Sequence, residues 1–236
     1  MQHSPNHLLA SLSATDFADI EPLLKTVPLV FGDVLSKTGT TIENIYFPHS
    51  GIVSLVVEMT DGDMIETAMT GRDGVWGAVA VLDGKLSVNK ALVQLAGTAS
   101  VITADALRRV AEKNTPLRSL LLRHEQFLLA QAQQSAACNA KHNVEPRMCR
   151  WLLRMRDVTG QDDLDITQEF LGQMMGVRRT SVSLVASALQ EAGLIRYRRG
   201  HVHIRDVDGL GKVACECHGV VKAHYARLIL DRALVS

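Results

Sequence analysis

Two arginines and three hydroxyl side chains stand together in the stretch GVRRTSVSL, residues 176–184. A guanidinium can donate two parallel hydrogen bonds to the edge of guanine, and short hydroxyls suit phosphate oxygens. Side chains of these types, gathered within one helical turn or two, are therefore suited to the surface of duplex DNA. The five residues are Arg178, Arg179, Thr180, Ser181 and Ser183.

The apolar residues around this stretch indicate two short helices joined at a turn. Thr167 can cap a first helix, whose apolar positions are Leu171, Met174 and Met175. Gly176 permits a sharp turn. In a second helix, the spacing of Val177, Val182, Val185 and Leu189 predicts one buried face. The opposite face then carries Arg179, Thr180, Ser183 and Ser187, with Arg178 and Ser181 in the first turn.

A basic hairpin follows the second helix. Residues 195–197 and 202–204 alternate like two strands that turn at Arg199–Gly200, and Arg198, Arg199 and His201 lie at the tip. Two arginines alone would fit an ordinary helical hairpin with a solvated polar face. The glycine turn, the small polar outer face and the basic hairpin together favour a winged helix-turn-helix that binds DNA. The predicted DNA-contacting residues are Thr167, Arg178, Arg179, Thr180, Ser181, Ser183, Ser187, Arg198, Arg199 and His201.

The charge distribution agrees with this interpretation. The chain of 236 residues has no net charge, but residues 1–140 hold 10 Lys and Arg against 14 Asp and Glu, and residues 141–236 hold 15 against 11. A polyanion would therefore meet the second half. The sequence contains no membrane-spanning apolar run, no secretory signal and none of the common nucleotide-binding or hydrolase motifs. We expect a cytoplasmic protein that is not an enzyme.

The elements before residue 142 predict an α+β chain with three parts. Residues 1–114 contain short β-rich runs, including GVWGAVAVL at 74–82, that are punctuated by glycines, which is typical of an antiparallel β-roll or jelly roll. Residues 115–141 form a long helix, with Thr115 as its cap and Pro116 in its first turn. Residues 142–236 contain the winged helix-turn-helix.

The long helix has two possible packing partners. Its stripe at 3-4 spacing is apolar early and polar later, so it could be buried within one subunit or pair with a second copy in a homodimer; we favour the homodimer. The stripe consists of Leu117, Leu121, His124, Leu128, Gln131 and Ser135.

The whole chain resembles the Crp–Fnr family of bacterial transcription regulators. The stretch ITQEFLGQMMGVRRTSVSLVASALQEAGLI, residues 166–195, is similar to that family's helix-turn-helix without a gap, and the order of β-roll, long helix and winged helix also agrees. The likeness is strong over 142–205 and mainly architectural over 1–140. It implies a homodimer that binds a near-palindromic site on double-stranded DNA, contacts RNA polymerase and responds to a small-molecule effector.

The resemblance also assigns roles to single residues. Arg179 falls on the family's guanine-reading arginine, and Ser181 falls on a position that commonly touches phosphate. Thr180 replaces a base-reading Glu, and Leu184 stands where some members have a second base-contacting Arg. These two departures put the usual consensus site in doubt.

The sensor half departs further from the family pattern. Ala78 replaces the Glu that binds the ribose of a cyclic nucleotide, although Gly77 before it is kept. Asn89 and Lys90 stand near the position of the phosphate-binding Arg. We therefore expect an effector other than cAMP, or none. The residues matching the family's effector pocket are Gly77, Ala78, Asn89, Lys90, Leu121, His124 and Leu128.

The four cysteines support neither a disulfide framework nor an iron–sulfur cluster, because no cysteine precedes Cys138. On a helix Cys215 and His218 share a face and Cys217 points elsewhere, which leaves two ligands and predicts no metal site. Two other functions remain open. One is a stand-alone ligand sensor that docks a protein partner, and the other is a thiol or metal redox sensor.

Overall fold

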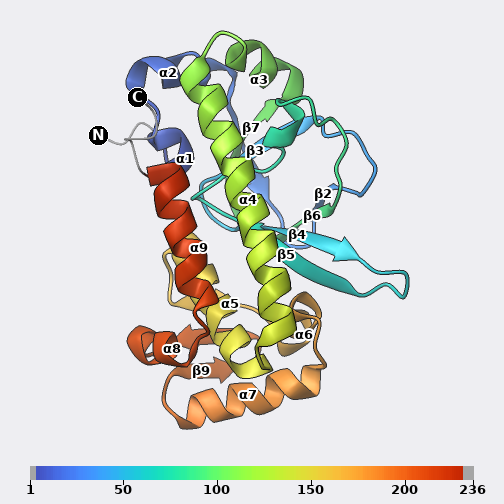
Figure 1. Cartoon of the computed structure of the whole chain (residues 1–236), viewed down its shortest axis with the longest axis vertical. Helices are drawn as coiled ribbons and strands as arrows, with labels where there is room; N and C mark the ends of the chain where they lie inside the picture. Colours follow the sequence, from blue (N-terminus) through green and yellow to red (C-terminus); the bar gives the residue numbers. More distant parts are fainter. Residues whose placement is uncertain (1–3, 231–236) are drawn as a thin grey trace. The chain divides into compact units, whose positions relative to one another are not determined.

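The computed structural model in Figure 1 describes residues 4–230. The chain divides into two compact units. Among the described residues, unit 1 comprises 4–55, 68–130 and 223–230, and unit 2 comprises 56–67 and 131–222. The predicted segment 1–114 begins with residues 1–3, and the predicted segment 142–236 finishes with residues 231–236. Both stretches lie outside the described residues.

Two antiparallel sheets build most of unit 1, as the glycine-punctuated β runs predict. One sheet has the strand order β1-β7-β3, and Ile45 of β3 pairs with Ile102 of β7. The other has the order β2-β6-β4-β5, and the outer parts of β4 and β5 belong to unit 2. The strands are β1 (Lys25–Leu29), β2 (Val34–Ser36), β3 (Asn44–Pro48), β4 (Ile52–Glu58), β5 (Met64–Thr70), β6 (Lys90–Leu95) and β7 (Gly97–Thr103).

Short capped helices flank these sheets. Asn6, Ser13 and Thr103 each accept a hydrogen bond from a backbone N–H in the first turn of a helix. The helical elements before residue 142 are α1 (His7–Ala10), α2 (Ala14–Ala18), η1 (Glu21–Leu23), η2 (Ala78–Ala80), α3 (Ala104–Ala111) and α4 (Thr115–Lys141).

Two local predictions in this half are wrong. The run GVWGAVAVL at 74–82 is not a strand but a turn followed by the 3-10 helix η2, because Gly77 adopts a φ of +90° and breaks the extended backbone. The long helix α4 starts as expected, but its cap is Asn114 rather than Thr115. The Asn114 side chain accepts a hydrogen bond from the Leu117 N–H at 2.9 Å, which makes Thr115 the first helical residue.

The stripe predicted for pairing on α4 packs inside the chain. Leu117, Leu121 and Leu128 are buried in the apolar core that also contains residues of both sheets, and His124 is fully buried. The opposite side of α4 is exposed, and it also carries apolar residues at heptad spacing. Leu122 is 60% and Leu129 is 59% exposed, and the exposed Ala136 continues the row.

Unit 2 contains the helix-turn-helix and the hairpin expected after residue 142, together with a third strand, β8, that the sequence did not predict. The sheet has the order β8-β10-β9, and α5 ends at Gly160, which adopts the left-handed conformation. The elements after α4 are α5 (Val144–Thr159), β8 (Asp163–Asp165), α6 (Gln168–Met175), α7 (Arg179–Glu191), β9 (Ile195–Arg198), β10 (His201–Ile204), α8 (Val207–Val213), α9 (Cys217–Tyr225) and η3 (Ala226–Leu230). The end of α9 from residue 223 and all of η3 belong to unit 1.

The four cysteines are buried, and the geometry around Cys215 and Cys217 differs from the prediction. Cys215 precedes α9 instead of lying on it, so the helical spacing that paired Cys215 with His218 does not apply. Cys217 Sγ lies 3.7 Å from the His142 ring nitrogen Nδ1, whereas the His218 ring turns to the Asp157 carboxylate at 2.8 Å.

Within residues 4–230, no helix combines the length and the apolar character that a bilayer crossing requires.

Candidate nucleic-acid interface

The turn between α6 and α7 is held by hydrogen bonds at both of its sides. Thr167 caps α6, since its hydroxyl accepts from the Phe170 N–H at 3.1 Å. Gly176 ends α6 with a φ of +64°, a conformation that favours glycine. The buried Arg147 of α5 donates to the Met175 carbonyl at 2.5 Å, which satisfies a free carbonyl at the helix end. The turn therefore has a fixed shape.

A second glycine lets α6 and the start of α7 approach closely. A Cβ atom on Gly172 would lie 3.0 Å from the Val177 carbonyl oxygen and 3.4 Å from the Arg179 backbone nitrogen. Such contacts are tighter than ordinary packing permits, and both partners are backbone atoms that cannot turn aside. Gly172 thus sets the spacing between the two helices.

The buried face of α7 is shifted slightly from the prediction. Val182, Ala186 and Leu189 are buried, whereas Val185 is half-buried. Because Ala186 lies four residues after Val182, it faces the core more directly than Val185 does. The side chains predicted to point outward do so, except that Ser181 and Ser183 are half-buried. The exposed set consists of Arg178, Arg179, Thr180, Leu184 and Ser187.

Ser183 has partners within the protein. Its hydroxyl lies 2.6 Å from the Gln168 side-chain oxygen and 3.1 Å from the Arg179 carbonyl, so it can donate to one of them at a time. The predicted phosphate contact of Ser183 is thus secondary to a contact between α6 and α7.

The hairpin after α7 turns at the predicted residues. Arg198 pairs with His201, and the two residues between them, Arg199 and Gly200, have φ values of +48° and +84°. Positive φ at both central positions is typical of a tight two-residue turn. Arg198, Arg199 and His201 are all exposed. The His201 ring contacts Asp165 of β8, so any positive charge on the ring is partly offset there.

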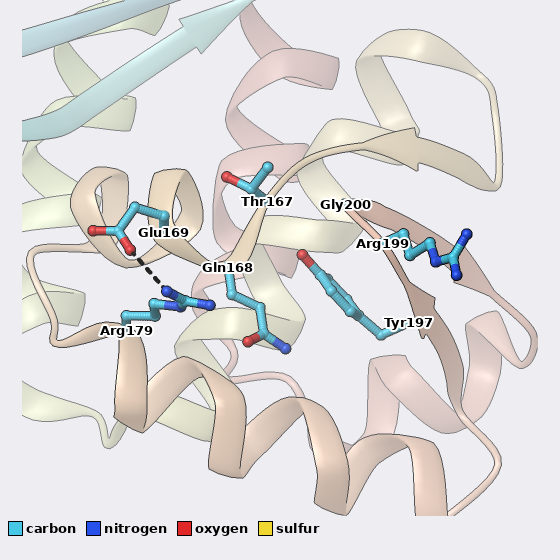
Figure 2. A pocket seen from close by; sticks show the side chains of 7 residues that line it. All are labelled: Thr167, Gln168, Glu169, Arg179, Tyr197, Arg199 and Gly200. Carbon is cyan, nitrogen blue, oxygen red and sulfur yellow. Dashed lines mark ion pairs between the residues drawn. The ribbon is translucent and has the colours of Figure 1, made fainter.

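A pocket of about 400 Å³ lies between the start of α6, the start of α7 and the hairpin (Figure 2). Arg179 points to Glu169 across it, with their charged atoms 3.6 Å apart, and Arg199 extends away at the hairpin end (Figure 2). The lining residues are Thr167, Gln168, Glu169, Arg179, Tyr197, Arg199 and Gly200.

Four residues of this region are missing from the sequence prediction. Gln168 and Glu169 directly follow the Thr167 cap. Their position in the first turn of α6 could have predicted that they lie beside the start of α7. Tyr197 alternates with exposed arginines on β9; burial raises the pKa of its hydroxyl, which donates to the Ile166 carbonyl at 2.8 Å. Arg147 gave no sequence signal, because nothing in the pattern of α5 distinguishes it from a surface arginine.

The residues predicted for an effector pocket lie in unit 1 and are mostly packed. Ala78, Leu121 and Leu128 belong to one apolar cluster, and Gly77 starts η2 in its left-handed conformation. His124 is fully buried and accepts a hydrogen bond from the Val75 N–H at 3.3 Å. The other two predicted residues, Asn89 and Lys90, are half-buried at the start of β6.

One carboxyl of α4 is perturbed in this unit. Burial raises the pKa of Glu125 to about 7, and a hydrogen bond with the Val79 backbone partly opposes the shift. Val79 is part of η2, so Glu125 faces the segment where the family resemblance places an effector. The charge of this carboxyl therefore changes near neutral pH.

The helix-turn-helix of α6 and α7 and the hairpin that follows it give unit 2 a winged-helix arrangement. Residues 146–213 match the model of the Crp-like helix-turn-helix domain. A comparison with curated proteins finds no significant match.

Solved structures of transcription regulators share the fold of about four fifths of the chain. FixK2 from Bradyrhizobium japonicum has 15% identity and a TM-score of 0.70, over 81% of this chain and 98% of that one. The c-di-GMP-responsive regulator CLP from Xanthomonas campestris has 16% identity and a TM-score of 0.66, over 81% and 99%. A CRP/FNR-family regulator from Thermus thermophilus has 21% identity and a TM-score of 0.63, over 80% and 98%. The chain thus has the fold of Crp/Fnr-type transcription regulators, with a Crp-like helix-turn-helix domain for binding DNA.

Proposed function

We propose that the protein is a homodimeric transcription regulator that binds a near-palindromic DNA site and contacts RNA polymerase. In this proposal α7 enters the major groove and the β9–β10 hairpin lies on the flanking backbone. The observation that carries it is the exposed row at the start of α7, above all Arg179, whose side chain is 66% exposed. The protein acts by binding and carries no catalytic site in this account.

Base reading is assigned to Arg179 and Leu184. A guanidinium at the N-terminal end of α7 reaches guanine, with two hydrogen bonds, once it leaves Glu169. Leu184 is 75% exposed and lies further along the same helix. An apolar side chain in the groove suits the methyl group of thymine. The pair predicts a half-site that contains a guanine and a nearby thymine.

Phosphate binding is assigned to the residues around this pair. Such contacts fix the position of the module on DNA without reading the sequence. The donors on α6 and α7 and in their first turns belong to Thr167, Arg178, Thr180, Ser181 and Ser187, and those on the hairpin belong to Arg198, Arg199 and His201.

The exposed side of α4 supplies the surface for a second copy of the chain. Leu122, Leu129 and Ala136 are spaced seven residues apart, which is the repeat of a helix that pairs with another helix. Large apolar residues at two successive positions of that repeat would otherwise remain in water. We therefore assign dimerisation to this row and not to Leu121 and Leu128.

The effector of unit 1 is proposed to be a small molecule other than cAMP. Ala78 is fully buried and its side chain offers no acceptor for a ribose hydroxyl, and Lys90 replaces a planar guanidinium with a point charge. An iron–sulfur cofactor is not part of the proposal, since no cysteine lies in residues 1–137.

The test compares Arg179→Ala and Arg198→Ala on a selected DNA site and on random duplex, across a series of salt concentrations. Arg179→Ala should weaken the selected site by about 1–3 kcal/mol and flatten the preference at one base pair per half-site. Arg198→Ala should weaken both duplexes alike and lower the salt slope by about one.

Two outcomes would overturn the assignment. An equal loss on both duplexes for Arg179→Ala would make Arg179 a phosphate contact. Absence of any salt-dependent binding to duplex DNA by the wild-type protein would favour the alternative of a sensor that docks a protein partner.

A further inference from the structure

Three cysteines and a histidine converge in unit 2, outside the residues of the proposed DNA-binding surface. The Sγ atoms of Cys138, Cys215 and Cys217 and a ring nitrogen of His142 all lie within 4.8 Å of one another. The three cysteines are buried and form a cluster of their own, separate from the apolar core of unit 1. Cys138 lies in the last turn of α4 and His142 directly follows that helix, whereas Cys215 lies just before α9 and Cys217 is its first residue.

The separations of these atoms suit one tetrahedral ion. A zinc–sulfur bond of about 2.3 Å places the corners of a tetrahedron about 3.8 Å apart. The Sγ atoms of Cys138 and Cys215 are 3.5 Å apart, and Cys217 Sγ is 3.7 Å from His142 Nδ1. A disulfide needs sulfur atoms about 2 Å apart. The longer separation between the Sγ atoms of Cys138 and Cys215 therefore fits two ligands of one ion and not a disulfide bond.

We propose that Cys138, His142, Cys215 and Cys217 bind a single Zn²⁺ ion. Three thiolates and one imidazole are a donor set that zinc binds with four-coordinate geometry. Four protein ligands leave no open position for water or substrate, so the site is structural and not catalytic. A polynuclear iron–sulfur cluster would need its ligands spread around several metal atoms, which donors within 4.8 Å of one another do not allow.

Neighbouring polar groups orient two of the four ligands. The Nε2 atom of His142 lies 3.2 Å from a Glu216 carboxylate oxygen, which leaves Nδ1 directed to the cysteines. A carboxylate on the far nitrogen of a histidine is the usual arrangement around protein-bound zinc. The Gln134 side-chain NH₂ donates to Cys217 Sγ at 3.0 Å, which fixes the position of this sulfur. Chance packing of cysteines would not require either contact.

The ligands bracket the DNA-binding domain in the sequence. Cys138 and His142 precede the matched residues 146–213, and Cys215 and Cys217 follow them. A bound ion would therefore close a loop that contains the entire helix-turn-helix and hairpin. Closing a long loop lowers the entropy of the unfolded chain, so zinc should stabilise this unit as a whole.

The experiment measures metal in the full-length protein. Purified under reducing conditions with Zn²⁺ and then dialysed, the protein should retain one zinc per chain. Titration of the metal-free protein with Co²⁺ should give the intense visible absorption of a tetrahedral thiolate complex, saturating at one equivalent. Cys217→Ser and His142→Ala should lose both properties. Cys149→Ser should keep them, because Cys149 is equally buried in unit 2 but outside the cluster.

A second variant tests the orientation of the histidine. Glu216→Gln should retain the Co²⁺ spectrum but lower the zinc affinity about 10-fold to 100-fold, the usual effect of losing such a carboxylate. Glu216 is exposed, so this variant should fold normally.

Three outcomes would overturn the proposal. The first is a wild-type protein that retains no zinc and gives only the weak spectrum of octahedral Co²⁺. The second is zinc retention that Cys217→Ser and His142→Ala leave unchanged. The third is a mass loss of two hydrogens between Cys138 and Cys215 under reducing conditions, which would mark a stable disulfide. None of these measurements depends on whether the protein binds DNA.

Discussion

The start of α7 and the segment around η2 are the two places where the family resemblance expects contact with another molecule, and they differ in exposure. Arg179 keeps 66% of its side chain in solvent, beside the Glu169 carboxylate. Ala78 of η2 is fully buried within an apolar cluster. Ala78 and Lys90 replace the polar groups that the resemblance expects in unit 1, whereas unit 2 keeps the expected arginine at Arg179 although it differs at Thr180 and Leu184. Function is thus easier to infer for unit 2 than for unit 1.

The largest effect should come from α4, because a two-fold site requires two copies of α7. Leu122→Glu combined with Leu129→Glu should convert the protein to monomers in analytical ultracentrifugation and weaken binding to the two-fold site by about 100-fold or more. Both leucines are more than half exposed, so the fold should remain.

A matched substitution outside α4 tests whether dissociation is specific to this row or follows from any charge placed on an exposed apolar residue. Val88→Glu replaces an exposed apolar residue elsewhere in unit 1 and should leave the dimer intact. Dimers that persist in the double variant would contradict the role of this row, and Leu121→Asp should unfold unit 1 rather than dissociate the dimer.

A pH effect should distinguish unit 1 from unit 2. The Glu125 carboxyl has a pKa of about 7 in the folded protein, against an ordinary value of 4.5. The Glu125 carboxyl binds its proton more tightly in the folded protein than in the unfolded chain. The free energy of unfolding should therefore fall as the pH rises from about 4.5 to 7. At about 1.4 kcal/mol per pKa unit, Glu125→Gln should be more stable than the wild type at pH 8 by up to about 3 kcal/mol, and nearly equal at pH 4.

Thermal unfolding at a series of pH values measures this difference. Glu112→Gln, at an exposed carboxyl of the same unit, should leave the pH profile unchanged. A parallel profile for Glu125→Gln and wild type would show that the pKa of Glu125 is not raised by folding.

A smaller effect is expected at the pocket between α6, α7 and the β9–β10 hairpin. Glu169→Gln removes the partner of Arg179 and a negative charge beside the DNA, so affinity for all duplexes should rise by up to about 1 kcal/mol. Fluorescence anisotropy with labelled duplex measures it, and Glu191→Gln at the other end of α7 is the control. Weaker binding by Glu169→Gln would mean that Glu169 positions Arg179 for base reading.

The smallest effect should be that of cAMP, which we expect to leave thermal stability and DNA affinity unchanged. A ligand that binds only the folded protein would add about 2.7 kcal/mol at 100 times its Kd. A thermal shift of that size would show that unit 1 binds cyclic nucleotides despite Ala78.

The sequence predicted the elements of unit 2 well, because their signals are local. The Thr167 cap, the Gly176 turn and the Arg199–Gly200 hairpin each depend on one or two residues with marked conformational preferences. The two faces of α7 followed from periodicity, except that Val185, Ser181 and Ser183 are half-buried.

Features that depend on distant contacts were not predictable in this way. The two sides of α4 have similar apolar spacing, so periodicity alone could not decide that Leu121 packs inside while Leu122 faces solvent. The sequence also did not predict that Cys138 and Cys217 lie close together, because residues far apart in the sequence are brought together only by the fold. The run at 74–82 was misread because its valines and tryptophan suggested a strand, whereas a left-handed Gly77 decided the backbone.

The convergence of Cys138, His142, Cys215 and Cys217 has a mechanical consequence. The chain enters and leaves the winged-helix domain at nearly the same point, with donor atoms from both ends within 4.8 Å. With the proposed ion bound, tension applied along the chain would pass from the end of α4 to the start of α9 through the four ligands instead of through the elements between them. The two connections of the winged-helix domain would then meet at one crosslink.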